Sequence, residues 1–280
     1  MKPGIIAATT LTGFTGMVLA VGGVPDTMPA LACMVSLVSA AAGSAMLNIL
    51  LEAAADAKMK RLERRVAALE RVGRQRALLL AAMLITIGLI VSRLFLNRNA
   101  SLLILAAILF YTLVYTLGLK RSPWGAVPGS LTGALPVLIG GAAAGRPFGA
   151  AGLILFIVML FWQPPHFWTL AIRFREDYER AGMPALPTAL GTSRTRILIL
   201  LGNAALIPVS LILWFCGYCS AVFAFTALLA GGCLLTACYL FTVTSNRFGL
   251  AFRCSIIYLV VLHLAIIVDI CLMRGLSITG

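Results

Sequence analysis

The sequence predicts an all-α, polytopic membrane protein. Of its 280 residues, 61% are hydrophobic and only 11% are charged, whereas soluble domains carry roughly 25% charged residues. The apolar runs are about 20 residues long, which is the length that a helix needs to cross a bilayer. These runs lack the alternation of barrel strands, and lipid admits only helices or closed barrels. Helices are therefore expected throughout.

About nine transmembrane helices are expected, and the whole chain, residues 1–280, is expected to form a single membrane domain. The first apolar run is too long for the hydrophobic part of a cleavable signal peptide and is interpreted as the first span. Two connections are longer than the others and run from Glu52 to Arg76 and from Arg173 to Arg196. The expected spans are 5–24, 28–51, 77–96, 100–119, 126–145, 150–172, 197–217, 220–243 and 252–273.

The basic residues predict the orientation in the membrane. Eighteen of the 22 Lys and Arg residues fall on the side of the N-terminus, beginning with Lys2. By the positive-inside rule the N-terminus is cytoplasmic and the C-terminus lies outside, in a cytoplasmic (inner) membrane of bacterial type. The net charge of +13 would suggest nucleic acid in a soluble protein, but no basic soluble domain is present, so no nucleic-acid partner is expected. The other side carries Arg93, Arg98, Arg146 and Arg274.

The carboxylates share the basic side, although the positive-inside rule does not require it. Two exceptions are Asp26, on the other side, and Asp269, inside the last span. Acidic and basic groups gathered at one face of an apolar protein predict a site for a charged substrate facing the cytoplasm. The carboxylates of this side are Glu52, Asp56, Glu63, Glu70, Glu176, Asp177 and Glu179.

The end of the second span carries a candidate metal site. Asn48, Glu52 and Asp56 are spaced four residues apart, so on one helix all three project from one face. Such hard oxygen ligands suit Mg²⁺, which is commonly shared with substrate phosphates. Lys58 and Arg61, which follow with Lys60, are typical of a diphosphate cradle. The alternative is an ordinary helix end with solvated charges, but Asn48 lies in an apolar run, where a polar residue usually faces a cavity.

Two further segments place polar groups near the same face. One, from Phe161 to Pro187, contains His166, which as a lone intramembrane histidine is more often a packing residue than a ligand. The other, from Tyr111 to Gly141, is rich in Gly and Pro and could let a flat ligand approach the backbone, but its spacing favours close helix packing through small residues. A C-x-x-C pair at Cys216 and Cys219 lacks a second ligand pair, so packing is preferred over a redox or metal role. The cations that these segments contribute at the face include Arg173, Arg175, Lys120 and Arg121.

Together these segments resemble the UbiA family of intramembrane prenyltransferases. The family's first motif, N-x-x-x-D/E-x-x-x-D-x-x-M-x-R, is matched in the stretch from Asn48 to Arg61. The chain departs from the family at Leu62, Val66 and Gly125, where Thr, Pro and Asn are usual. Within the family the chain is similar to the branch that farnesylates haem, on the evidence of "KPG", "GALPVLIG", "PPHFW" and "REDYERAGMPALP".

The resemblance implies a fold, a reaction and a set of site residues. The nine helices would surround a central cavity. A farnesyl group would pass from farnesyl diphosphate to the 2-vinyl group of haem B, with addition of water, giving haem O and diphosphate. The cofactor would be Mg²⁺, held through the diphosphate by Asn48, Glu52 and Asp56, with Arg61 as a further catalytic residue. The substrate contacts would be Lys58, Lys120, Arg121 and Arg175 for the diphosphate, and His166, Trp168, Asp177 and Tyr178 for haem.

The implied partners are the two substrates and the bilayer, together with haem A synthase or assembly factors of terminal oxidases. Three other functions stay open. A related prenyltransferase would use an aromatic acceptor such as 4-hydroxybenzoate. A catalytically impaired, haem-binding relative would follow from the altered segment after Arg61. A transporter would require broken helices in paired repeats and polar residues at the midplane, where Asp269 is the main carboxylate.

Overall fold

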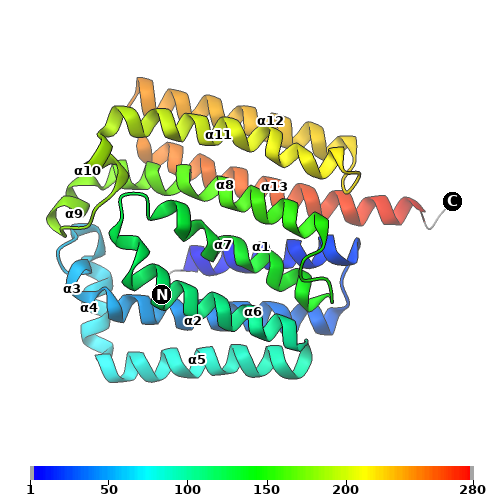
Figure 1. Ribbon diagram of the computed structural model, residues 1–280, viewed down its shortest axis with the longest axis horizontal. Helices are drawn as coiled ribbons and strands as arrows, with labels where there is room; N and C mark the ends of the chain where they lie inside the picture. Colours follow the sequence, from blue (N-terminus) through cyan, green and yellow to red (C-terminus); the bar gives the residue numbers. More distant parts are fainter. Residues whose placement is uncertain (1–2, 278–280) are drawn as a thin grey trace.

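The protein is a bundle of long helices that lie side by side (Figure 1). The computed structural model describes residues 3–277, with side chains described to residue 272, and this part of the chain contains no strand. Nine of its helical segments are long and apolar enough to cross a membrane, which confirms the predicted fold class. They are α1 (Pro3–Val21), α2 (Thr27–Leu51), α5 (Arg74–Phe95), α6 (Arg98–Leu109) with its continuation to Arg121, α7 (Ala126–Ala143), α8 (Ala150–Arg173), α11 (Thr192–Phe215), α12 (Ala221–Tyr239) with its continuation to Thr244, and α13 (Phe248–Ser277).

The two long connections are largely helical. The first contains α3 (Ala53–Asp56), η1 (Lys60–Leu62) and α4 (Glu63–Val72), and the second contains α9 (Arg175–Arg180) and α10 (Leu186–Leu190). Figure 1 shows these short helices together at one end of the bundle, with the end of α13 at the opposite end. The charge of both connections was predicted from the sequence, but their helices were not.

The observed ends of the spans differ from the expected ones by a few residues. The first helix ends at Val21 rather than at residue 24, and the last begins at Phe248 rather than at residue 252. Two residues counted for the orientation, Lys2 and the side chain of Arg274, lie outside the described residues. The orientation and the expected central cavity stay predictions.

Glycines allow α1 to lie very close to α7. A Cβ added at Gly16 would lie 2.2 Å from the backbone oxygen of Val137, and one added at Gly140 would collide with the backbone of Gly13. Small residues at such contacts are typical of membrane helices, because lipid supplies no hydrophobic drive and close backbone packing takes its place. The same helix α1 also packs on α2 and α13, so it lies at the centre of the bundle.

A few buried polar groups link the helices further. The Trp162 indole donates to the backbone oxygen of Ser255, and the Gln163 amide donates to that of Ser130. Asp269 accepts from the backbone N–H and the hydroxyl of Ser220, at the N-terminus of α12. This carboxylate therefore caps a helix, which accounts for it without a transport pathway.

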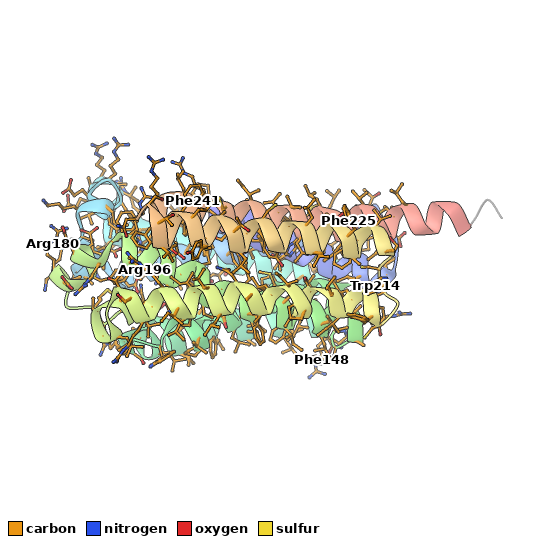
Figure 2. All side chains as sticks on the ribbon, turned by 90° about the horizontal axis from the view of Figure 1, so that it is seen from above. Phe148, Arg180, Arg196, Trp214, Phe225 and Phe241 are labelled. Carbon is orange, nitrogen blue, oxygen red and sulfur yellow. The ribbon has the colours of Figure 1, made fainter. Side chains whose placement is uncertain are left out.

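The two ends of the bundle differ in side-chain chemistry. Figure 2 shows Arg180 and Arg196 at the end that holds the short helices, and Trp214 and Phe148 toward the opposite end. Large apolar side chains such as Leu79 and Phe225 are exposed along the flanks of the helices between the two ends. A surface of this kind is compatible with lipid.

Substituting Gly16 by Ala should destabilise the bundle, because the added Cβ meets rigid backbone of α7. Overpacking of this kind costs roughly 1–3 kcal/mol, which should lower the thermal unfolding midpoint of the detergent-solubilised protein. The matched control is Gly152→Ala in α8, where nothing lies within 4 Å of the added Cβ. Equal midpoints for the two variants would contradict the close α1–α7 contact.

Candidate active site

The three oxygen-bearing residues at the end of α2 are buried. The exposed fractions of Asn48, Glu52 and Asp56 are 1%, 8% and 3%. The expectation that one continuous helix carries them is wrong in one detail: α2 ends at Leu51, and Glu52 adopts φ −97° and ψ 3°. The helical spacing of the three residues is kept, because the backbone N–H of Glu52 donates to the backbone oxygen of Asn48. The backbone N–H of Asp56 likewise donates to the backbone oxygen of Glu52.

Each of these three residues has a partner from another segment. Lys120, in η3 (Leu119–Arg121), forms an ion pair with Glu52. Arg65, in α4, lies 3.1 Å from the Asp56 carboxylate, and it donates to the side-chain oxygen of Asn48 at 3.3 Å. The site therefore joins α2, α3, α4 and η3 through neutralising pairs, since a buried carboxylate without a counter-charge is costly.

A π-helical turn positions a second hydrogen-bond partner of the Asn48 side chain. The fourth span widens at η2 (Phe110–Tyr115), and the Thr116 hydroxyl donates to the Tyr111 oxygen, five residues back. The same hydroxyl accepts from the Asn48 amide at 3.2 Å. Single π turns often occur at functional sites. Neither this turn nor the role of Arg65 was predicted from the sequence. The available signal for Arg65 was its place in the basic segment that follows Arg61.

Asp177 links the second long connection of the chain to the first through hydrogen bonds. Its carboxylate, 5% exposed, accepts from the backbone N–H groups of Lys60 and Arg61 at 3.2 and 3.3 Å. It also forms an ion pair with Arg180 in its own helix, and the Arg61 guanidinium lies 3.9 Å away. These contacts fix η1 against α9, and the expected contact of Asp177 with haem stays a prediction.

The pKa of Asp177 lies below its ordinary value of 3.8. Burial raises the pKa, but the hydrogen bonds from Arg180 and from the backbone of Arg61 and Lys60 outweigh burial. Because the pKa is lowered on folding, the stabilisation by this carboxylate is complete at neutral pH. It is lost only as the pH falls through the lowered pKa. Asp177 is therefore ionised throughout the physiological range.

Arg61 is held between aromatic rings and keeps one donor unused. Its guanidinium carbon lies 4.8 Å from the centroid of Phe174 and 5.1 Å from that of Tyr178. The Nε atoms of Arg61 and Arg65 are buried without a hydrogen bond among the described residues, and that of Arg61 lies 3.9 Å from the Asp177 carboxylate, beyond hydrogen-bonding distance. Buried donors are nearly always satisfied, so these two N–H groups indicate a ligand rich in acceptor oxygens.

His166 lies in an aromatic stack on the α8–α13 side. Its ring lies 4.4 Å from Trp162 and 4.3 Å from Phe252, both nearly parallel to it, and its Nδ1 is 2.6 Å from the Ser255 hydroxyl. Both faces of the imidazole are therefore covered. Trp168 packs edge-on against Trp124 and keeps a buried indole N–H without a partner in the described part of the chain.

Three of the predicted cations stand apart from the buried carboxylates. Lys58 and Arg121 are exposed, and Arg175 is paired with Glu179 of its own helix at 2.7 Å. The ion pairs of Glu52 and Asp56 are made instead by Lys120 and Arg65. Of the predicted cations, the structure brings Lys120 and Arg61 to the site.

The donor set suits a metal that is shared with a substrate. Within residues 3–272, no three His, Cys, Asp or Glu side chains lie close enough to enclose a metal ion by themselves. Two carboxylates and an amide oxygen, beside arginine donors without acceptors, fit Mg²⁺ that takes its other ligands from phosphate and water. The pair Cys216 and Cys219 consists of free thiols and belongs to no such cluster.

The fold and this site define a multi-pass membrane protein that gathers carboxylates and cations at one end of a helical bundle. The chain belongs to the UbiA prenyltransferase family, whose sequence model matches residues 7–261. This match confirms the resemblance seen in the motifs, and prenyl transfer is the activity of the family.

Relatives of the chain carry the name protoheme IX farnesyltransferase, and two of them illustrate the similarity. The one from Geotalea uraniireducens (strain Rf4) is 52% identical over 256 residues, covering 91% of this chain and 99% of the relative. The one from Aquifex aeolicus (strain VF5) is 36% identical over 273 residues, covering 96% of this chain and 92% of the relative. Both relatives therefore match over nearly their whole length.

Solved structures confirm the fold. A UbiA homolog from Aeropyrum pernix K1 superposes with a TM-score of 0.77 at 16% identity, covering 96% of this chain and 98% of its own. A UbiA homolog from Archaeoglobus fulgidus bound to GPP and Mg²⁺ superposes with a TM-score of 0.62 at 15% identity, covering 95% and 98%. At these identities the likeness concerns the fold alone.

Replacing Asp177 by Asn should loosen the contact between η1 and α9, because the charge that attracts Arg61 and Arg180 disappears. We expect the amides of Lys60 and Arg61 to exchange hydrogen faster, which hydrogen–deuterium exchange with mass spectrometry measures on a peptide that spans them. Glu179→Gln is the control, since its exposed pair with Arg175 contributes little. Unchanged exchange rates at these amides in Asp177→Asn would show that Asp177 does not fix η1 against α9.

Proposed function

We propose that this protein transfers the farnesyl group of farnesyl diphosphate to the 2-vinyl carbon of haem B, with addition of water, and releases haem O and diphosphate. The observation that carries the proposal is the buried set Asn48, Glu52 and Asp56, which meets Lys120 and Arg65 at one end of the bundle. The choice of haem and farnesyl follows the names of the two relatives.

The charges of this set suit a diphosphate with its metal. The carboxylates of Glu52 and Asp56 pair with Lys120 and Arg65, so both signs are present and balanced. A magnesium diphosphate could bind the carboxylates through the metal and the cations through its oxygens, leaving no buried charge without a partner. The unused Nε–H groups of Arg61 and Arg65 would donate to the same oxygens.

The proposed reaction begins with departure of the diphosphate. The bond between C1 of the farnesyl chain and oxygen breaks, and the electron pair leaves with the diphosphate. When bound, Mg²⁺ would supply positive charge to the leaving group, with Asn48, Glu52 and Asp56 as its ligands. Lys120, Arg61 and Arg65 would stabilise the growing negative charge from fixed positions, which is most effective away from bulk water.

The farnesyl cation would then be captured by the porphyrin. The 2-vinyl group of haem B supplies the electron pair for the new carbon–carbon bond, and the positive charge moves to the carbon next to the ring. Water adds there and loses a proton, which leaves the hydroxyl group of haem O. The overall balance consumes one water and one farnesyl diphosphate for each haem.

The proposed site would face the cytoplasm. The end of the bundle with the short helices carries Arg180 and Arg196 (Figure 2) and the two basic connections, which the positive-inside rule assigns to the cytoplasmic side. Both substrates carry anionic groups and apolar bodies. A site at the boundary of the bilayer can receive the apolar body from the lipid and the anionic group from the basic face.

The test is haem O formation by membranes that contain this protein and are supplied with haem B, farnesyl diphosphate and Mg²⁺. Asp56→Ala should lower the rate roughly 10²-fold or more, because it removes a fixed group that acts on the leaving diphosphate. Product is measured by chromatography, and membrane insertion is checked on an immunoblot. Asp26→Ala is the matched control, because Asp26 is an exposed carboxylate between α1 and α2.

Other outcomes would identify the alternatives. Prenylation of 4-hydroxybenzoate without haem O would assign an aromatic acceptor. Binding of haem B without turnover by the unchanged protein would assign the impaired, haem-binding relative. Normal haem O formation by Asp56→Ala would remove the metal assignment while leaving the membrane fold intact.

A further inference from the structure

A second basic site lies beside the proposed diphosphate site. Three arginines from two helix ends, Arg173 of α8 with Arg247 and Arg253 around the start of α13, line a pocket of about 410 Å³. No carboxylate lines this pocket. None of the three arginines forms an ion pair with any carboxylate of the described residues. The positive-inside rule explains arginines on this face, but not their convergence on one hollow.

The pocket is also placed at the start of a long helix. The backbone from Arg247 to Leu250 lines it, and α13 begins at Phe248. The first N–H groups of a helix and its dipole favour an anion there. Arg173 packs directly on this turn, since a Cβ at Gly249 would lie 2.8 Å from its Nη1. Three guanidinium groups and a helix start thus act on the same volume.

The pocket lies next to Arg61, in the proposed diphosphate site, and next to His166, a predicted haem contact. Phe174 carries Arg173 on its ring at 5.0 Å and Arg61 at 4.8 Å, so the two guanidinium groups are at most about 10 Å apart. Arg173 also follows His166 by two helical turns on the same face of α8. Arg253 follows Phe252, whose ring stacks on that histidine at 4.3 Å.

We propose that this arginine pocket, made by Arg173, Arg247 and Arg253, binds the two propionate carboxylates of the haem substrate. This inference rests on the proposed function. A porphyrin such as haem B carries its propionates on the edge opposite its vinyl groups. With the propionates in the pocket, a molecule of this size presents its vinyl edge toward the neighbouring Arg61 site, where the farnesyl cation would form. Arginine is suited to two carboxylates, because its planar fork binds each through two hydrogen bonds.

The experiment measures haem affinity separately from turnover. The protein is placed in phosphatidylcholine nanodiscs and titrated with haem B, or with haem B dimethyl ester, while the Soret band is followed. The double variant Arg247→Gln with Arg253→Gln should weaken haem B binding roughly tenfold or more, since charge-assisted hydrogen bonds are lost. The ester lacks the carboxylates, so its affinity should be the same in the variant and in the unchanged protein.

Two further variants complete the design. Gly249→Ala keeps every charge but displaces the Arg173 guanidinium, and it should also weaken haem B and spare the ester. Arg194→Gln removes an exposed arginine outside the pocket and should change neither affinity. Equal binding of haem B by the double variant and the unchanged protein would overturn the proposal.

An anionic lipid headgroup presents related chemistry, and the experiment separates it. If the double variant keeps its haem affinity but loses phosphatidylglycerol that copurifies with the unchanged protein, the pocket binds lipid and the proposal fails. Turnover separates this inference from the proposed function. Haem O formation with a KM for haem that the double variant does not alter would refute the pocket alone. Propionate-dependent haem binding without any haem O formation would refute the function alone.

Discussion

The constraint on which the site depends is the cost of burying charge at the end of an apolar bundle. Glu52 and Asp56 are almost fully buried, and an isolated buried carboxylate would be protonated or unstable. Lys120 and Arg65 remove that cost by ion pairing. Because these partners come from different connections, neutralising the charge also fixes the short helices relative to the spans.

Asp177 extends the same constraint to the second long connection. It receives two backbone N–H groups from η1 and the side chain of Arg180, so α9 is held against the segment that follows α3. The Arg61 side chain extends from that segment and lies against the rings of Phe174 and Tyr178. The Asp177 carboxylate thereby positions the Arg61 cation, and side chains locked by such contacts hold a binding site in a fixed geometry.

Local chemistry made part of this predictable from the sequence. The apolar runs predict the nine spans because each run is long enough to cross a bilayer, and the depth of Asn48 predicts that its face is buried. The break at Glu52 was not predictable, since the i to i+4 pattern is the same for a straight helix and for two helices joined by one distorted residue. The π turn at η2 left no signal in the apolar pattern for the same reason.

Long-range contacts explain the other differences. Asp177 and Arg61 are more than one hundred residues apart in the chain, so no local spacing could show that one fixes the other. Lys58 and Lys120 were equivalent as predicted cations, yet Lys120 pairs with the buried Glu52, while Lys58 is exposed. Which cation enters such a site depends on where each connection folds back, and that is determined by the packing of the spans that it joins.

Neutralisation also distinguishes the two basic regions at this end of the bundle. At Glu52 and Asp56 the cations are balanced by carboxylates, an arrangement that suits a ligand bringing both an anion and a metal. Around Arg173, Arg247 and Arg253 no carboxylate lines the pocket, an arrangement that suits a ligand bringing negative charge alone. A metal diphosphate and the propionate edge of a porphyrin differ in this same respect. Because Arg61 and Arg173 both lie against the ring of Phe174, the two kinds of charge are adjacent, as the proposed reaction between two such substrates requires.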